Sequence, residues 1–163
     1  MLETDCFWLE LPYISAIRND CLELAENGGG WVEHRSFKSK MLDHKKAIKD
    51  DFIKFLANKF ELVVAVMKME PHTTYNWHTD GARKCAVNML INDAPSHCIF
   101  NIETDGYITK YAELKYKPET YYLFNTDIHH MILNGDKTRY MMSIQLNNDI
   151  TYPELVEIVK GYK

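Results

Sequence analysis

A histidine and a carboxylate lie two residues apart in the stretch Trp77-His78-Thr79-Asp80. Side chains two apart on an extended strand project from the same face, so His78 and Asp80 could bind the same metal ion. One more histidine from a neighbouring strand would complete a set of two imidazoles and one carboxylate. That set suits Fe(II) or Mn(II) and leaves positions open for other ligands. The alternative is a surface turn, since Asp80-Gly81 is also ordinary turn chemistry.

Two further groups with chemical potential lie downstream, the pair His129-His130 and Arg139. On a strand beginning at His129, only one of the two histidines points inward, and the alternation alone does not say which. Arg139 opens a predicted strand and shares a face with Ser143. A guanidinium matches a carboxylate through two parallel hydrogen bonds, so Arg139 suits an anion at the mouth of a barrel. An exposed arginine at a strand end is the alternative.

Eight short strands are predicted to carry these residues. They are separated by turn signals such as Asp105-Gly106 and Asn134-Gly135, and this spacing is typical of a sandwich or barrel. The predicted strands are Leu62–Met67, Tyr75–Asp80, Lys84–Ile91, His97–Glu103, Tyr107–Leu114, Thr120–Asn125, His129–Leu133 and Arg139–Leu146.

The residues before Glu61 are predicted to be mostly helical. A strand is expected at Cys6–Leu11, a helix from Pro12 to the stop signal at Asn27-Gly28, and a short strand within Trp31–Phe37. A second helix is expected over residues 42–58. The expected fold is therefore a jelly roll, or double-stranded β-helix, of the cupin-like type. We expect one domain over residues 1–163, with helical support in 1–60, the jelly-roll core in 61–147 and a helix in 148–163.

Composition narrows the function classes. Of 163 residues, 46% are hydrophobic and 26% charged, as in ordinary globular proteins, and the net charge of −4 argues against non-specific nucleic-acid binding. No apolar run approaches the roughly 20 residues that span a bilayer. The acidic start lacks the order of a signal peptide, so a cytoplasmic location is expected. The four cysteines form no close pair and are expected to be buried thiols: Cys6, Cys21, Cys85 and Cys98.

The order of these groups resembles that of the Fe(II)/2-oxoglutarate-dependent dioxygenases: His-x-Asp, about fifty residues, a histidine, about ten residues, then arginine. The stretches Leu123–Thr126 and His130–Asn134, followed by Arg139, are similar to the distal half of the aspartyl/asparaginyl β-hydroxylase-like branch. The proximal stretch, from Pro71 to Asn88, resembles the small bacterial and phage-type members. The resemblance covers roughly residues 61–147 and selects His130 over His129.

The resemblance implies an oxidoreductase. His78, Asp80 and His130 would hold Fe(II), with 2-oxoglutarate and O₂ as co-substrates. Arg139 would bind the distal carboxylate of 2-oxoglutarate. Further residues expected near the co-substrate or substrate are Asn88, Ser143, Tyr75 and Trp77.

The expected reaction is hydroxylation of an amino-acid side chain (Asp, Asn or Pro) in a small molecule, peptide or protein, with no membrane partner. Two alternatives use the same fold. One is a non-catalytic jelly-roll module that binds a ligand, and the other is a cupin-type metalloenzyme that does not use 2-oxoglutarate.

Overall fold

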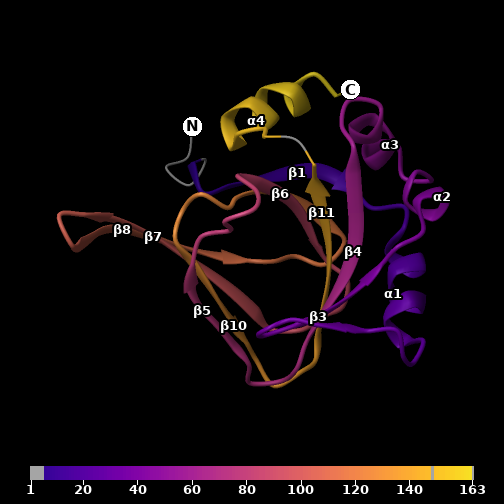
Figure 1. Ribbon diagram of the computed structural model, residues 1–163, viewed down its shortest axis with the longest axis horizontal. Helices are drawn as coiled ribbons and strands as arrows, with labels where there is room; N and C mark the ends of the chain where they lie inside the picture. The colour runs from indigo at the N-terminus through magenta and orange to yellow at the C-terminus, as the bar shows by residue number, and fades with distance from the viewer. Residues whose placement is uncertain (1–5, 148, 163) are drawn as a thin grey trace.

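Two antiparallel sheets form the centre of the protein (Figure 1). The computed structural model describes residues 6–147 and 149–162. The larger sheet has seven strands in the spatial order β1 (Trp8–Ile14), β9 (Thr120–Asn125), β6 (Cys85–Leu90), β11 (Arg139–Leu146), β4 (Leu62–Met69), β3 (Lys38–Met41) and β2 (Val32–Glu33). The smaller sheet has four, in the order β5 (Thr74–His78), β10 (His130–Asn134), β7 (Ser96–Thr104) and β8 (Tyr107–Lys115).

The strand predictions for residues 61–147 are confirmed. All eight strands form, and most ends differ from the predicted ones by one or two residues. The mainly β, cupin-like jelly-roll fold with flanking helices is confirmed as well. The alternating pattern succeeds because period-2 side-chain placement and turn residues both act locally along the chain.

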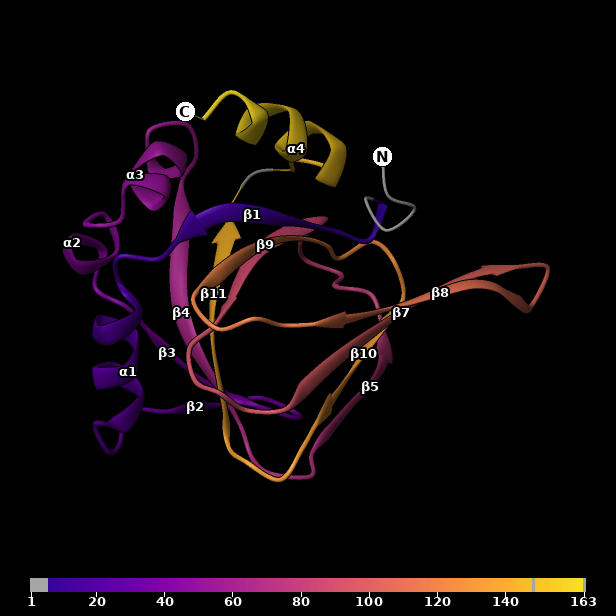
Figure 2. The ribbon, with the colours of Figure 1, turned by 180° about the vertical axis from the view of Figure 1, so that it is seen from behind.

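The larger sheet separates two hydrophobic cores. Its outer face packs on α1 (Arg18–Glu26), α3 (Asp51–Ala57) and α4 (Tyr152–Lys160), while α2 (His44–Ala47) lies beside them (Figure 2). Its inner face meets the smaller sheet through side chains such as Leu90, Phe100 and Phe124. Alternation therefore fixes the role of each strand position. On β6, Val87 and Met89 face the helices, and Asn88 between them faces the other sheet.

The expectation of a helix starting at Pro12 is wrong. Pro12 lies inside β1, an edge strand that pairs only with β9. The pairing register of β1 shifts between Glu10 and Ile14, so an irregular edge accommodates a residue without a backbone N–H. The helix begins later, at Arg18, and ends at Glu26 before the glycines, as expected.

Two other N-terminal expectations need correction. The region around Trp31–Phe37 supplies the hairpin of β2 and β3, which extends the larger sheet rather than forming a lone strand. The helix expected over residues 42–58 is divided into α2 and α3, because Asp50 caps the start of α3. Residues 6–60 thus contribute strands to the barrel as well as helices around it.

The C-terminal helix forms within the expected range. α4 starts after Thr151, whose backbone N–H and hydroxyl both donate to the Glu154 carboxylate at 2.8 and 2.6 Å. Pro153 occupies the first turn, where its missing N–H costs no hydrogen bond. Across the described residues, no helix has the length and apolar character needed to cross a membrane.

Cys21, Cys85 and Cys98 are free thiols, in agreement with the scattered spacing of the cysteines. Cys21, Cys85 and Cys98 are buried, as expected, whereas Cys6 is exposed. Burial raises the pKa of the Cys21 thiol to about 12 and that of Cys85 to about 11, so both stay protonated near neutral pH.

Asp50 ties the helices to the sheet. Its Oδ1 accepts hydrogen bonds from the backbone N–H groups of Phe52 and Ile53, at 3.0 and 3.1 Å. Its Oδ2 accepts from the N–H of Ala16 at 2.9 Å and from the hydroxyl of Tyr121, on β9, at 2.8 Å. The carboxylate is almost fully buried, and four donors stabilise it there.

We therefore expect Asp50→Ala to lower the free energy of unfolding by about 3 kcal/mol, because it removes a helix cap and leaves buried donors unpaired. Urea denaturation followed by circular dichroism measures this. The control is Asp43→Ala, which removes the exposed cap of α2 and should cost about 1 kcal/mol or less. Equal losses in the two variants would contradict the anchoring role of Asp50.

Candidate metal centre

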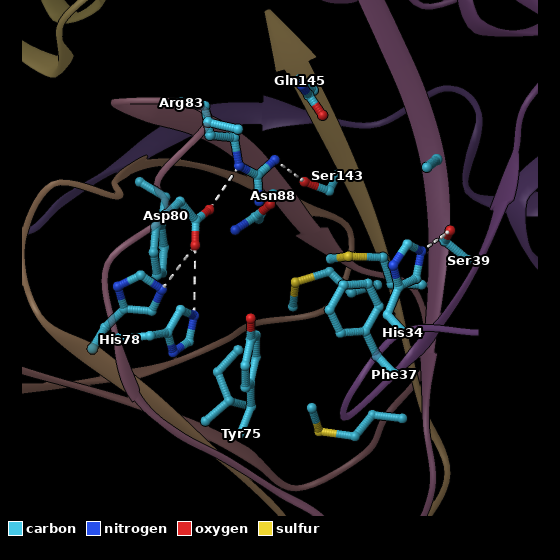
Figure 3. A pocket seen from close by; sticks show the side chains of 18 of the residues that line it. His34, Phe37, Ser39, Tyr75, His78, Asp80, Arg83, Asn88, Ser143 and Gln145 are labelled. Atoms are coloured by element: carbon cyan, nitrogen blue, oxygen red, sulfur yellow. Dashed lines mark hydrogen bonds and ion pairs between the residues drawn. The ribbon is translucent and has the colours of Figure 1, made fainter. Parts of the chain in front are cut away.

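Strand pairing brings the two histidines together. β5 and β10 are antiparallel neighbours in which His78 lies directly opposite His130, and the two rings are 4.3 Å apart. The Nε2 atoms of His78 and His130 lie 3.5 and 3.8 Å from Oδ1 of Asp80. Ligand atoms of all three residues lie within 4.8 Å of one another. Figure 3 shows His78 and Asp80 pointing toward each other on one wall of the pocket. Three donors at this spacing fit a single metal ion.

Hydrogen bonds orient both imidazoles for a metal. The Nδ1 of His78 lies 2.6 Å from the carbonyl oxygen of Asn76, and the Nδ1 of His130 lies 2.8 Å from that of Ile128. A carbonyl only accepts, so Nδ1 carries the proton and the Nε2 lone pair points to the centre. Burial lowers the pKa of His130 to about 4, against a smaller opposing effect of the Ile128 carbonyl. His130 is therefore neutral near pH 7, as a ligand must be.

Asp80 lies beyond the end of β5, which stops at His78, so the expectation that both ligands sit within one strand is wrong. Thr126, just after β9, fixes the loop instead. Its carbonyl accepts from the N–H of Asp80 at 3.1 Å, and its hydroxyl donates to the carbonyl of Arg83 at 2.6 Å. Its own N–H donates to the carbonyl of Lys84 at 3.2 Å. Three bonds from one buried threonine place the carboxylate as firmly as a strand would.

Arg83 holds the second oxygen of Asp80, a contact that the sequence did not reveal. Its Nε donates to Oδ2 of Asp80 at 2.7 Å, and its Nη1 donates to the hydroxyl of Ser143 at 3.2 Å. Burial alone would raise the pKa of Asp80. The neighbouring imidazole of His78 and the positive charge of Arg83 outweigh burial and lower the pKa to about 2. Asp80 is therefore ionised, and Oδ1 is the oxygen left facing the histidines.

Arg139 lies in the same cavity as the three ligands, a space of about 420 Å³. The guanidinium is buried at 3% exposure, with Nη2 3.0 Å from the sulfur of Met141 and its carbon 5.6 Å from the Tyr116 ring. No described carboxylate pairs with it, and its Nε has no hydrogen-bond partner. Burial lowers the pKa of Arg139, yet a guanidinium stays charged at any physiological pH. An unpaired buried cation facing a cavity is a site for an anion.

Other polar groups around Arg139 also lack partners. Among the described residues, the Oδ1 of Asn88 and the hydroxyl of Tyr116 are buried and have no hydrogen-bond partner within 3.5 Å. Asn88 and Ser143 lie opposite each other on β6 and β11 and both line the cavity, so the sequence placed them correctly on the inner face. The hydroxyl of Ser143, in contrast, already accepts a hydrogen bond from Arg83. Tyr116 was not anticipated, because it follows β8 and no local pattern marks it.

A β-bulge separates the two aromatic residues expected at the pocket. His130 faces His78 and Ile132 faces Tyr75, so two residues of β5 lie opposite one residue of β10. The extra residue reverses the alternation. Tyr75 lines the cavity with its ring 3.8 Å from that of His78, whereas Trp77 is 42% exposed and lies outside the lining. The expectation that Trp77 lines the pocket is therefore not met.

The remaining histidines lie away from the ligand set. His129 is exposed beside buried His130, His72 is exposed at the turn before β5, and His97 pairs with Glu113 on the smaller sheet. His34 was not anticipated. It lies at the rim of the cavity in the β2–β3 hairpin, where its ring stacks on Phe37 at 4.6 Å.

Comparison with known proteins gives similarity at the level of fold. No protein-family model and no curated protein matches the chain. A prolyl-4-hydroxylase of Pseudomonas putida superposes with a TM-score of 0.63 and 12% identity, covering 88% of this chain and 94% of the other. A viral collagen prolyl hydroxylase from Paramecium bursaria Chlorella virus-1, solved with 2-oxoglutarate, gives 0.60 and 16%, covering 86% and 94%.

A third solved structure, a Trichoplax adhaerens prolyl hydroxylase with a peptide fragment of a hypoxia-inducible factor, superposes with a TM-score of 0.63 and 12% identity. It covers 98% of this chain and 89% of the other. The chain thus shares the jelly-roll fold of these oxygenases over nearly its whole length. None of the three is named as an aspartyl or asparaginyl hydroxylase.

The ligand set predicts one metal site per chain. We expect cobalt(II), which has visible absorption bands, to bind wild-type protein at one site, with His130→Ala weakening binding about 100-fold or more. His129→Ala is the matched control, because its exposed side chain points away from the ligands, and it should bind cobalt like wild type. A larger loss in His129→Ala than in His130→Ala would contradict the assignment.

Arg83 predicts a separate effect on the open metal positions. In Arg83→Met, Oδ2 of Asp80 loses its donor and becomes free to occupy a second position on the ion. We expect cobalt to bind at least as tightly, while an added chelating acid such as 2-oxoglutarate binds about tenfold more weakly, the scale typical of such supporting contacts. Titrations followed by the cobalt spectrum measure both affinities. Lys84→Met, with its exposed ion pair to Asp149, serves as control, and equal acid affinities in both variants would refute the role.

Proposed function

We propose that the protein is an Fe(II)- and 2-oxoglutarate-dependent oxygenase. The donor set of two imidazoles and one carboxylate is the one that suits Fe(II) in oxygenases of this kind and leaves positions open for other ligands. Both histidines have their Nδ1 atoms occupied and their Nε2 atoms directed at Asp80. No cysteine belongs to this cluster, so thiolate, the softer ligand favoured by structural zinc, is absent from it.

The observation that carries the proposal is the unpaired guanidinium of Arg139 in the cavity of the metal ligands. An uncompensated buried charge is costly, so a counter-charge must be supplied by a ligand. A dicarboxylic keto acid supplies it: one end chelates a metal, and the other is a free carboxylate. Arg139 would bind that free end, with the Tyr116 hydroxyl, buried without a hydrogen-bond partner among the described residues, as a further donor.

In this function the residues of the chain bind the metal ion and the co-substrate, orient them and keep water away from them. When bound, Fe(II) and 2-oxoglutarate supply the oxidising chemistry, placing one atom of O₂ on a substrate carbon and the other in succinate, with release of CO₂. Arg83 keeps Asp80 ionised and directed at the ion. The inner-face apolar side chains of Met67, Met69 and Ile132 exclude water around the co-substrate. Neither a ligand-binding module nor a metalloenzyme without a keto acid explains the buried cation beside the ligands.

We propose hydroxylation of an amino-acid side chain, free or within a peptide, as the reaction. Support comes from the fold, shared with hydroxylases whose names give prolyl substrates and, in one case, a bound peptide fragment. Since fold alone does not determine substrate, the residues of the cavity itself must argue for the acceptor.

Anaerobic titration tests the proposal. Wild-type protein with Fe(II) and 2-oxoglutarate should develop a weak visible absorption band at about 500 nm, expected for a keto acid chelated to an open Fe(II) site. His78→Ala should show none. Arg139→Gln should keep metal affinity and lose about 100-fold in 2-oxoglutarate affinity, because the distal carboxylate loses a buried charged partner. Exposed Arg35→Gln is the control. Absence of the band in wild type would reject the function.

A further inference from the structure

The cavity divides into a polar and an apolar side. Asp80, Arg83, Arg139 and the two ligand histidines carry its charged and titratable groups, apart from His34 at the rim. The opposite wall comes from the inner positions of β3 and β4 and from the β2–β3 hairpin. Most of its side chains are apolar or aromatic: Phe37, Met41, Val63, Ala65 and Met67, with Tyr75 between this wall and the metal ligands (Figure 3). The polar exceptions are Ser39 and His34, whose side chains are hydrogen-bonded to each other at 2.8 Å.

Aromatic contacts close the gap between the two sheets at this wall. Phe37, beside β3, lies 5.9 Å from the ring of Tyr75, on β5, and these strands belong to different sheets. Tyr75 in turn stacks on the metal ligand His78 at 3.8 Å. A group bound against Phe37 and Tyr75 would therefore be close to the metal ligands, as a hydroxylation target must be.

Each charged group that lines the cavity has a partner in the proposed function, so none is available to pair with a charged substrate. Asp80 is shared by the histidines and Arg83, and Arg83 is held by Asp80 and Ser143. In the proposed function, Arg139 is neutralised by the co-substrate. An acidic or basic target side chain would thus be buried without a partner against thioethers and aromatic rings, which is strongly unfavourable. An aliphatic side chain meets no such penalty, and flexible methionines pack well around it.

We propose that this apolar wall is the acceptor site and that it selects an uncharged aliphatic side chain, with Phe37 and Tyr75 as specificity-determining residues. The inference rests on the proposed oxygenase function and, among the Asp, Asn and Pro acceptors expected from the sequence, excludes the polar Asp and Asn. The volume of about 420 Å³ lies near the low end for small-molecule sites, so beside a co-substrate there is room for a group of side-chain size.

The test uses amino acids capped as N-acetyl amides and the full-length protein loaded with redox-inert zinc and 2-oxoglutarate. Calorimetry should show that capped leucine and capped methionine bind at least tenfold more tightly than capped aspartate or capped lysine. Phe37→Ala should weaken capped leucine at least fivefold and leave 2-oxoglutarate affinity unchanged, whereas Phe37→Leu should restore most of the binding. Tyr107→Ala, an exposed aromatic change on β8, is the control and should match wild type.

Several outcomes would overturn the inference. They are equal or tighter binding of capped aspartate or lysine, binding of none of the probes, or loss of 2-oxoglutarate affinity in Phe37→Ala. The measurements distinguish failure of the oxygenase function from failure of the aliphatic acceptor site. A protein that gives no Fe(II)/2-oxoglutarate band but binds capped leucine through Phe37 rejects the oxygenase function and supports an aliphatic site. A protein with the band that prefers capped lysine rejects only the aliphatic acceptor.

Discussion

The pairing of β5 with β10 is the constraint on which the site depends. It sets His78 opposite His130, residues 52 positions apart in the sequence, and no side-chain contact could do this without the backbone ladder. Because strand register moves in whole residues, a slip of one position would turn a histidine to the opposite face. The register is held from the other side as well, where β10 pairs with β7 over its whole length. The pairing of β10 with both β5 and β7 therefore fixes the positions of the two histidine ligands.

The sequence predicted what depends on local alternation and missed what depends on tertiary contacts. Strand identity and the strand face that Arg139 shares with Ser143 could be inferred because period and turn chemistry are local, whereas the choice of His130 over His129 came from the family resemblance. The face of Trp77 could not, since a bulge appears only once the partner strand is known. Pro12 misled for a similar reason: proline suits a helix start and an irregular edge strand equally.

The two arginines of the cavity also show which contacts the sequence alone could predict and which it could not. The sequence contains Arg83 three residues after Asp80, a spacing with no fixed meaning outside a helix, so its ion pair emerged only from the loop that Thr126 fixes. Arg139 could be marked as a candidate anion site because it opens a predicted strand, shares a face with Ser143 and stands where the family resemblance expects an arginine. The two arginines differ in their contacts. Arg83 is partly exposed and satisfied within the protein, whereas Arg139 is buried without a counter-charge among the described residues. Only the second requires a ligand.

The polarity of the cavity follows from two neighbouring strands. Three of the four inner positions of β11 are polar, namely Arg139, Ser143 and Gln145, and the exception is Met141. Each of the four faces an apolar residue of β4 across the ladder: Met69, Ala65, Val63 and, opposite Met141, Met67. Alternation therefore places a polar column directly beside an apolar one. Since the jelly roll itself is shared by proteins with different chemistry, this pairing of columns distinguishes the cavity more than the fold does. A co-substrate lying along the polar column would leave the apolar column as the remaining surface for an acceptor.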